Sequence, residues 1–276
     1  MENAKEYYDK TSREYVQKWQ DMDRQSTFNA SFYFRKKIME TVLEMARVEK
    51  NDRVVELGCG TGLVLRELLK KTGRVFGTDI SPEMLKRVQD STLKDKKVVI
   101  AENFLEADAR HRDAEVLLMP NGISKLDLPK NYFDKMLSVE VLRYVDDLEN
   151  ALCNVAAVMK MDSRYIFTIT NFWSSSLFPV KFSIRKILGL VKPQKELLQY
   201  FVTERSIRRY LKNAGLEVVE FRKMGLLFAK PLIKKFIKNQ AAAEKIYKLD
   251  KALSGKPILG KFADTFVIAV KKSASL

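Results

Sequence analysis

One stretch near residue 55 constrains the fold more than any other part of the chain. Residues 54–57 are a short apolar run, and Gly58, Gly60 and Gly62 follow it at every second position. Residues 63–71 then place leucine and valine among charged residues at a helical spacing. Glycine lets the backbone turn sharply and lets a ligand approach the main chain. The pattern predicts a strand, a ligand-binding turn, and a helix whose first N–H groups face the ligand.

A second apolar run ends in an acid at an informative spacing. Residues 74–79 predict another strand, and Asp79 follows Gly58 by about 20 residues, where doubly wound folds place the carboxylate that binds a ribose. A dinucleotide enzyme is the natural competitor, but its pattern is G-x-G-x-x-G. Here the pattern is G-x-G-x-G, and Leu63 stands where the last glycine would be. The sequence therefore favours a ribose-containing ligand other than NAD.

Four segments carry a resemblance to a known family. Residues 56–62 (ELGCGTG) and 77–85 (GTDISPEML) look like its first two motifs, and residues 133–142 and 165–171 look like its fourth and fifth strands. They resemble the class I S-adenosylmethionine-dependent methyltransferases, in particular the methyltransferase type 11, UbiE-like members. The resemblance implies S-adenosylmethionine as the cofactor. It also implies an α/β, doubly wound, Rossmann-like sheet of seven mostly parallel strands, the last antiparallel.

The resemblance also implies which residues form the site. After the third strand the family usually has Asp, whereas this chain has Asn121-Gly122, whose amide can still meet an adenine edge. His111 lies between two arginines in a charged segment and is a poor candidate for a base. No metal site is expected. The residues expected to bind the cofactor are Glu56, Gly58, Cys59, Gly60, Gly62, Asp79, Ile80, Met84, Asn121, Gly122, Val139 and Glu140, and the catalytic candidates are Glu140, Tyr144 and Tyr15.

The chain is expected to form a single domain over residues 1–276. Residues 1–47, rich in large aromatic side chains, form a helical cap that closes over the cofactor in the resembling family. Residues 50–171 are the cofactor-binding core, residues 172–202 a helical lid inserted after the fifth strand, and residues 203–276 the rest of the sheet with basic helices.

Within these parts, local signals predict individual elements. Ser81 and Pro82 predict the start of a helix over 81–93. Residues 115–120 are the expected third strand, and residues 97–101 are the alternative for it. An inserted helix is expected between the two segments. The remaining expectations are helices over 146–160, 204–214 and most of 226–258, and strands over 216–221 and 265–270.

Composition limits the cellular compartments in which the protein is expected. Two cysteines are too few for a disulfide framework, and Cys59 and Cys153 are both expected to be buried thiols in a reducing compartment. The N-terminal residues are polar, so no signal peptide is expected, and no apolar run approaches the ~20 residues that span a bilayer. These features predict a cytoplasmic protein, either free in the cytoplasm or peripheral to the inner face of the membrane.

The distribution of charge indicates classes of methyl acceptor but not a particular molecule. The net charge is +15, and residues 181–276 carry the whole excess, with 22 Lys and Arg against 7 Asp and Glu. Apolar residues interleaved with lysines in 172–192 and 226–238 suggest contact with an anionic membrane and a lipid or lipid-like acceptor. A soluble small metabolite is the alternative, and a solvated basic surface would then explain the lysines. Nucleic acid and a non-enzymatic cofactor-binding module are less favoured, and the oligomeric state stays open.

Overall fold

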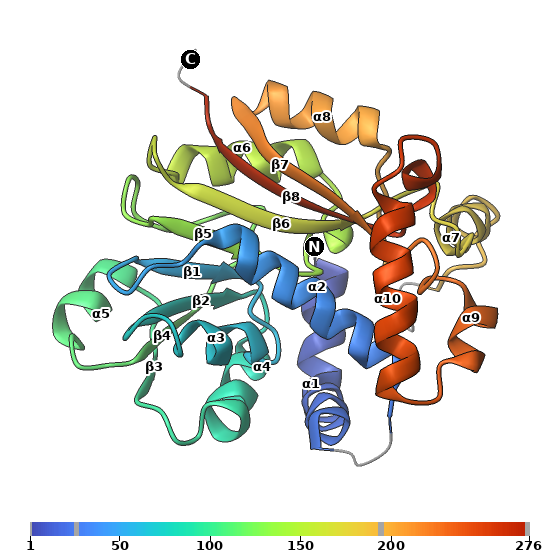
Figure 1. The fold of residues 1–276 in the computed structure, drawn as a ribbon. Coiled ribbons are helices and arrows are strands. Elements are labelled where there is room, and N and C mark those ends of the chain that lie inside the picture. Colours follow the sequence, from blue (N-terminus) through green and yellow to red (C-terminus); the bar gives the residue numbers. More distant parts are fainter. Residues whose placement is uncertain (1, 25–27, 193–195, 274–276) are drawn as a thin grey trace.

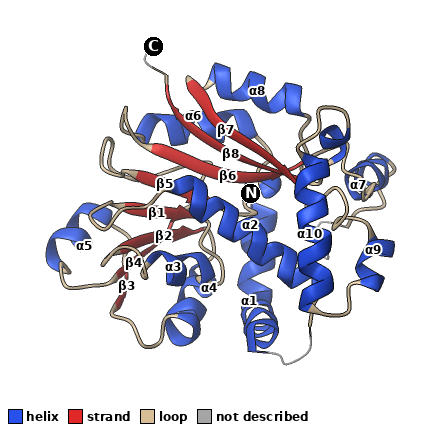
Figure 2. Cartoon of the chain, in the orientation of Figure 1, coloured by secondary structure: helices blue, strands red, loops and turns tan. Residues whose placement is uncertain are grey.

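The computed structural model describes residues 2–24, 28–192 and 196–273. Their strands form one sheet of eight in the order β3-β4-β2-β1-β5-β6-β8-β7, drawn in Figures 1 and 2. The strands are β1 Val54–Leu57, β2 Val75–Asp79, β3 Val98–Ile100, β4 Val116–Pro120, β5 Lys135–Ser138, β6 Arg164–Thr170, β7 Leu216–Met224 and β8 Thr265–Lys272. β8 pairs antiparallel with both β6 and β7, as expected of the last strand, and the other pairs are parallel.

The expectation of seven strands was wrong, and the additional strand is β3. Both segments that competed for the third place are strands. β4 pairs with β2, the third place, while β3 pairs with the outer side of β4. The helix α5 (Phe104–Arg110) connects them as a crossover, as expected for the segment between. Residues 98–100 are β-branched, which suits an edge strand with half-buried side chains.

Helices cover both faces of the sheet. Buried side chains of α5, α6 (Leu148–Val158) and α8 (Glu204–Asn213) pack on one face. The other face meets α2 (Ala30–Ala46), α3 (Leu63–Leu68), α4 (Pro82–Arg87) and α10 (Gln240–Ser254). Along β1, Val54 points to the α2 side while Val55 and Leu57 point to the α6 side, because strand side chains alternate.

Several local signals are confirmed. Ser81 accepts from the N–H of Met84 at the start of α4, which continues as a π-helical turn over Val88–Thr92. Gly215 follows α8 in the left-handed conformation. The basic region beyond β7 forms α9 (Pro231–Phe236), α10 and the short helix η3 (Leu259–Phe262). In the described part of the chain, no helix combines the length and apolar character needed to cross a bilayer.

One burial expectation was wrong. Cys59 is buried, but Cys153 is exposed. Both flanks of Cys153 are apolar, yet Leu152 and Val155 face the sheet while Cys153 falls on the outer side of α6. The helical period of 3.6 residues leaves some positions of any apolar run facing solvent.

The N-terminal and inserted segments are mainly helical. Residues 1–47 form α1 (Glu2–Arg24) and α2, and residues 1 and 25–27 of this cap lie outside the described residues. The segment 172–202 holds α7 (Phe178–Ile187) and returns to the sheet, where Val202 bridges Asn171. Residues 193–195 of it lie outside the description. None of its described residues lines the cavity described below, so its role as a lid stays a prediction.

Candidate active site

The glycine turn is shaped by three residues in the left-handed region. Gly58, Gly60 and Gly62 have φ of 74°, 49° and 73°, values that side chains rarely tolerate. At Gly58 a Cβ would lie 2.4 Å from Cγ2 of Val141, so the turn also packs against the loop after β5. The N–H of Cys59 donates to the carbonyl of Thr78 (2.7 Å), which ties the turn to β2.

Asp79 holds this turn from the end of β2. Its two carboxylate oxygens accept from the N–H of Gly60 (2.9 Å) and from the N–H of Ser81 (3.0 Å). The side chain is 8% exposed and lines the cavity. Each carboxylate oxygen has a second lone pair, so Asp79 can accept further hydrogen bonds from a ligand.

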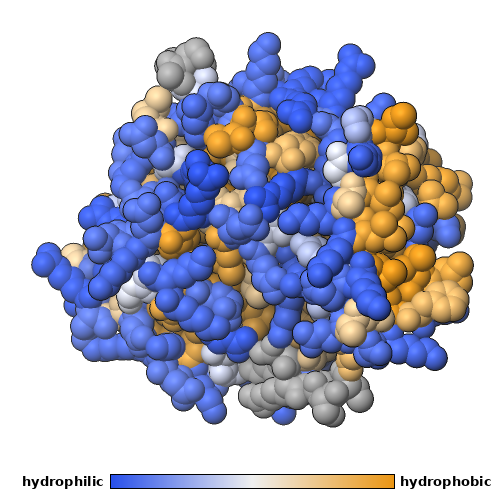
Figure 3. Space-filling view, viewed as in Figure 1, coloured by the Kyte–Doolittle hydropathy of each residue, from blue (hydrophilic) through white to orange (hydrophobic). Residues whose placement is uncertain are grey.

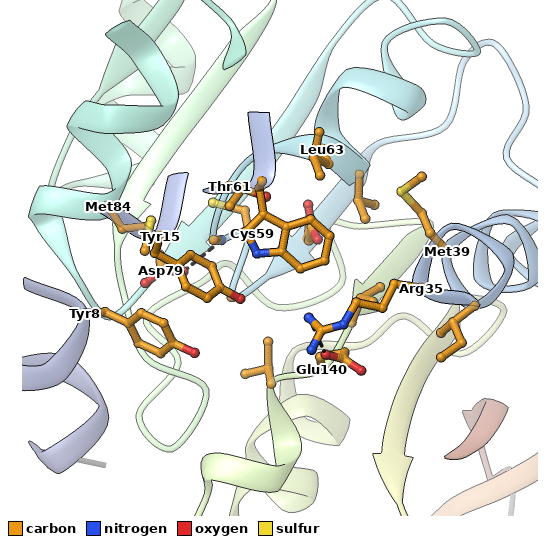
Figure 4. Close-up of a pocket in the computed structure, with 18 of the residues that line it drawn as sticks. Tyr8, Tyr15, Arg35, Met39, Cys59, Thr61, Leu63, Asp79, Met84 and Glu140 are labelled. Atoms are coloured by element: carbon orange, nitrogen blue, oxygen red, sulfur yellow. Dashed lines mark hydrogen bonds and ion pairs between the residues drawn. The ribbon is translucent and has the colours of Figure 1, made fainter. Parts of the chain in front are cut away.

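A cavity of about 360 Å³ opens above the turn. In Figure 4, Tyr8 and Tyr15 of α1 face Arg35 and Met39 of α2, and Glu140 lies beside Arg35. Every residue expected to bind the cofactor lines this cavity except Gly62, which starts α3 just behind it. The catalytic candidates Tyr15 and Tyr144 line it as well, while His111 caps α5 elsewhere.

One wall of the cavity is acidic. Glu56 is 2% exposed, and its Oε2 has no hydrogen-bond partner among the described residues. Burial raises the pKa of Glu56 well above its usual range, and the nearby Asp79 raises it further. Burial also raises the pKa of Asp79, against the lowering effect of its N–H partners. This wall, comprising Glu56, Cys59 and Asp79, favours a ligand that carries positive charge.

The opposite wall is already ion-paired. Glu140 follows β5 with φ of 61°, and its N–H donates to Oγ1 of Thr168 (2.7 Å). Its Oε2 lies 3.2 Å from Nη1 of Arg35 and 3.2 Å from Nη2 of Arg143. Although burial acts to raise it, Arg143 and Arg35 bring the pKa of Glu140 below its usual value. Glu140 is therefore ionised and a weak proton acceptor.

Tyrosines complete the inner surface. The rings of Tyr8 and Tyr15 meet edge to face at 5.3 Å, and Tyr8 meets Tyr144 at 6.2 Å. The hydroxyl of Tyr144 receives a hydrogen bond from Arg143 (2.8 Å). Burial, and then Tyr144, raises the pKa of both Tyr8 and Tyr15. Their hydroxyls stay protonated near neutral pH, so they can orient an acceptor but not remove its proton.

Sequence reasoning missed part of this site. Arg35, Arg143, Trp19 and Met39 line the cavity, and the Arg35 guanidinium lies 4.9 Å from the ring centre of Trp19. Trp19 and Tyr8 belong to the aromatic residues of the first 47 positions, which the sequence indicated only collectively as a cap over the cofactor. No local pattern marks Arg35, because its ion pair with Glu140 joins residues far apart in the chain. Arg143 lies three residues after Glu140, a spacing that could have suggested their ion pair.

These features define a class of site: a doubly wound sheet that presents a glycine turn, a carboxylate for ribose hydroxyls and an unpaired acidic wall. S-adenosylmethionine fits it, because that cofactor combines a ribose with a sulfonium and an ammonium group. The orphaned Oε2 of Glu56 is a buried acceptor suited to such a cation. Asp79 has free lone pairs for the ribose.

Comparisons with known proteins agree with this class. A family model described as a methyltransferase domain matches residues 30–221. An uncharacterized methyltransferase of Schizosaccharomyces pombe is 25% identical over 207 residues, 72% of this chain and 71% of that protein. The ubiquinone/menaquinone biosynthesis C-methyltransferase UbiE of Erwinia tasmaniensis is 30% identical over 127 residues, 45% of each chain. Magnesium protoporphyrin IX methyltransferase of Synechocystis, solved with S-adenosylhomocysteine, shares the fold with a TM-score of 0.57 at 14% identity, covering 98% of both chains.

The chain belongs to the methyltransferase-domain family and is a class I S-adenosylmethionine-dependent methyltransferase. S-adenosylmethionine is its cofactor. The matched region includes the glycine turn, Asp79 and Glu140, which line the cavity, whereas the lining residues of α1 lie outside it.

Proposed function

We propose that this enzyme transfers a methyl group from S-adenosylmethionine to a small amphiphilic acceptor of lipid-like character. The observation that carries the proposal is the inner surface of the cavity between α1 and α2. It is mainly apolar and aromatic, with the side chains of Tyr8, Tyr15, Trp19, Phe32, Ile38, Met39 and Leu43. Such a surface suits the apolar body of an amphiphile.

Residues of the two walls bind different groups of the cofactor. Asp79 accepts from the ribose hydroxyls, and Glu56 offers a buried acceptor to the cationic part. Arg35, with Glu140 as its partner, suits the carboxylate of the amino-acid portion. When bound, S-adenosylmethionine supplies a methyl group on a positively charged sulfur. The task of this chain is to align the acceptor with that methyl group and to exclude water.

The chemistry of the walls narrows the acceptor atom. Glu140 is held ionised by two guanidinium groups, and Tyr8 and Tyr15 have raised pKa values. None of these groups is poised to accept a proton near neutral pH. The acceptor is therefore a nucleophile that reacts without a general base from these residues. A neutral amine or thioether would do so, as would a phenol or enol that loses its proton to water.

The relatives support the amphiphilic class. The Erwinia protein is named for methylation in ubiquinone and menaquinone biosynthesis. The match spans only 45% of that protein, so the acceptor of this chain is a proposal of its own. A soluble small metabolite remains the second candidate, because the polar side chains of Arg35, Arg143 and Tyr144 also reach the cavity.

The proposal is tested with methyl-labelled S-adenosylmethionine and two extracts, one of total lipids and quinols and one of water-soluble small molecules. We expect label in the organic phase, in a product that mass spectrometry finds heavier by one methyl group. Gly58→Arg serves as the inactive control. Label only in the water-soluble product would support the metabolite instead. Label in neither, with cofactor binding retained in calorimetry, would support a binding module.

A further inference from the structure

Exposed apolar side chains from three separate segments gather on one face of the molecule. In Figure 3 they form the orange area at the right, where Figure 1 draws α7, α9 and the loop above α10. Ile187 is 83% exposed, and Phe236 and Ile258 are each 72% exposed. We call this the apolar face; its exposed members are Trp173, Leu177, Phe178, Ile184, Ile187, Leu188, Leu190, Leu232, Phe236, Ile258, Leu259 and Phe262.

Hydrogen bonds hold two of these segments against one another and against the turn after β7. The N–H of Ser175 donates to the carbonyl of Phe262 (2.8 Å), and its hydroxyl donates to the carbonyl of Leu226 (2.6 Å). The side chain of Asn171 donates to the carbonyl of Lys261 (2.8 Å). The stretch before α7 is thus hydrogen-bonded both to η3 and to the turn that leads to α9. The apolar face is therefore one surface whose segments are held together, and we call it a platform.

The charge around this platform is predominantly positive, and Glu196 is ion-paired with Arg185 of α7 (2.7 Å). The sequence segments 172–195, 221–243 and 251–263 contain no acidic residue. Lys181, Lys235, Lys238, Lys256 and Lys261 are exposed, and in the described part of the chain no acid lies within ion-pair distance of them. Lys234 differs, because it is half-buried and burial lowers the pKa of its ammonium group.

We propose that the apolar face docks the enzyme on an anionic lipid surface. Apolar side chains ringed by lysines describe an interfacial surface, since the rings and aliphatic groups enter the acyl boundary while the ammonium groups reach the headgroups. A second copy of the chain is a poor occupant, because two predominantly positive faces would repel one another. A patch of this kind left in water is also uncommon on a monomer.

The face connects to the wall of the active-site cavity. Nζ of Lys186 in α7 lies 4.2 Å from the ring centre of Tyr200, whose N–H donates to the carbonyl of Arg143 (2.7 Å). The N–H of Leu198 donates to the side chain of Asn3 in α1 (2.9 Å). The return from α7 therefore touches both η2 (Leu142–Tyr144) and α1, which line the cavity. Docking would bring the cavity wall close to the lipid, and in this respect the inference rests on the proposed function.

Vesicle sedimentation tests the docking without any methyl transfer. At low salt we expect the protein to pellet with vesicles of phosphatidylglycerol and phosphatidylcholine and to stay in solution with phosphatidylcholine alone. Binding should fall as salt shortens the Debye length toward ~8 Å and below. A protein that remains in the supernatant with anionic vesicles at low salt overturns the proposal, whatever its enzymatic activity.

Variants separate a specific face from net charge. Lys235→Gln with Lys238→Gln should weaken vesicle binding about fivefold for each charge removed. The matched control is Lys71→Gln with Lys94→Gln, two exposed lysines on the cofactor-binding half with the same change in charge. Phe236→Ser with Ile187→Ser should weaken binding at unchanged charge. Equal effects of the two lysine pairs, or no effect of the apolar pair, would overturn the assignment to this face.

Trp173 reports insertion directly. It is 54% exposed in the stretch that leads to α7, and the second tryptophan of the chain, Trp19, lines the cavity. Brominated phosphatidylcholine in anionic vesicles should quench the fluorescence, and Trp173→Phe should abolish that quenching. Quenching that survives Trp173→Phe would contradict the proposal. So would a stable dimer in sedimentation equilibrium that Phe236→Ser dissociates, because the face would then be a protein interface.

Discussion

The two walls of the cavity hold carboxylates of opposite character. Glu56 and Asp79, at the ends of β1 and β2, have raised pKa values because both are buried, and because Asp79 lies near Glu56 and Asp9 lies near Asp79. Glu140, after β5, has a lowered pKa despite burial because two arginines meet it. A cationic cofactor would give the carboxylates of the first wall a positive partner, whereas the carboxylate of the second wall is ion-paired without a ligand. We therefore expect the cofactor to gain binding free energy at the first wall and to be oriented by the second.

The largest expected effect is at the turn that supports the acidic wall. Gly58→Ala should reduce cofactor affinity by at least 100-fold, because a Cβ would meet Val141 and φ of 74° costs roughly 1–2 kcal/mol for an L-residue. Calorimetry with S-adenosylhomocysteine measures it. The matched control is Gly189→Ala, which has φ of 67° but open space around its Cβ and lies outside the cavity. Equal affinity in both variants would contradict the assignment.

Asp79→Asn should have the next largest effect. It removes a charge-assisted hydrogen bond to the ribose and should weaken cofactor binding by about 1.5–3 kcal/mol. Thermal unfolding should also shift, because the carboxylate accepts from the N–H groups of Gly60 and Ser81. Calorimetry and thermal unfolding of the same sample separate the two effects. An unchanged affinity would remove Asp79 from the binding site.

Glu56→Gln and Glu140→Gln should change stability in opposite directions. The folded pKa of Glu56 lies above the unfolded value, so the native state binds more protons and loses stability as pH rises between the two. Gln resembles the neutral acid, so Glu56→Gln should raise the free energy of unfolding at pH 8 by about 1 kcal/mol. Glu140→Gln leaves two guanidinium groups without their counter-ion and should lower it by about 1 kcal/mol, allowing for partial exposure.

The pH profiles provide the control for this pair. The gain in Glu56→Gln should vanish as pH falls to the ordinary carboxyl pKa of about 4.3, where unfolded Glu56 is protonated too. The contribution of Glu140 is complete above that pKa and is lost as pH falls through the lower folded pKa. Denaturant unfolding from pH 4 to 8 measures both. Changes of the same sign at pH 8 would contradict the contrast between the walls.

The smallest expected effect is a release of protons. S-adenosylmethionine carries a sulfonium charge that S-adenosylhomocysteine lacks, so it should draw Glu56 toward its ionised form. We expect a fraction of a proton released per cofactor bound, and less with S-adenosylhomocysteine. Calorimetry in two buffers of different ionisation enthalpy measures this difference. Identical proton release for the two ligands would mean that Glu56 does not sense the sulfonium.

The part of the site that could be predicted from the sequence depends on local backbone geometry. The glycines of the turn, Asp79 at the end of β2 and Ser81 at the start of α4 were all placed from spacing and residue type. The segment 97–120 shows the limit, because two short apolar runs each looked suitable for one strand. Both are strands, since an open sheet can accept another parallel strand at its edge. Cys153 was misplaced because an apolar run does not say which helix face meets the sheet.

The sequence by itself determined the doubly wound sheet, the cofactor turn and the concentration of positive charge in the last third of the chain. These follow from φ preferences, from periodicity and from composition, which act over a few residues or need no coordinates. Only the tertiary structure decided that Arg35 meets Glu140, that Oε2 of Glu56 lacks a hydrogen-bond partner among the described residues, and that the exposed side chains of α7, α9 and η3 share one face. Such contacts join segments distant in the chain, and they depend on how the helices pack against the sheet.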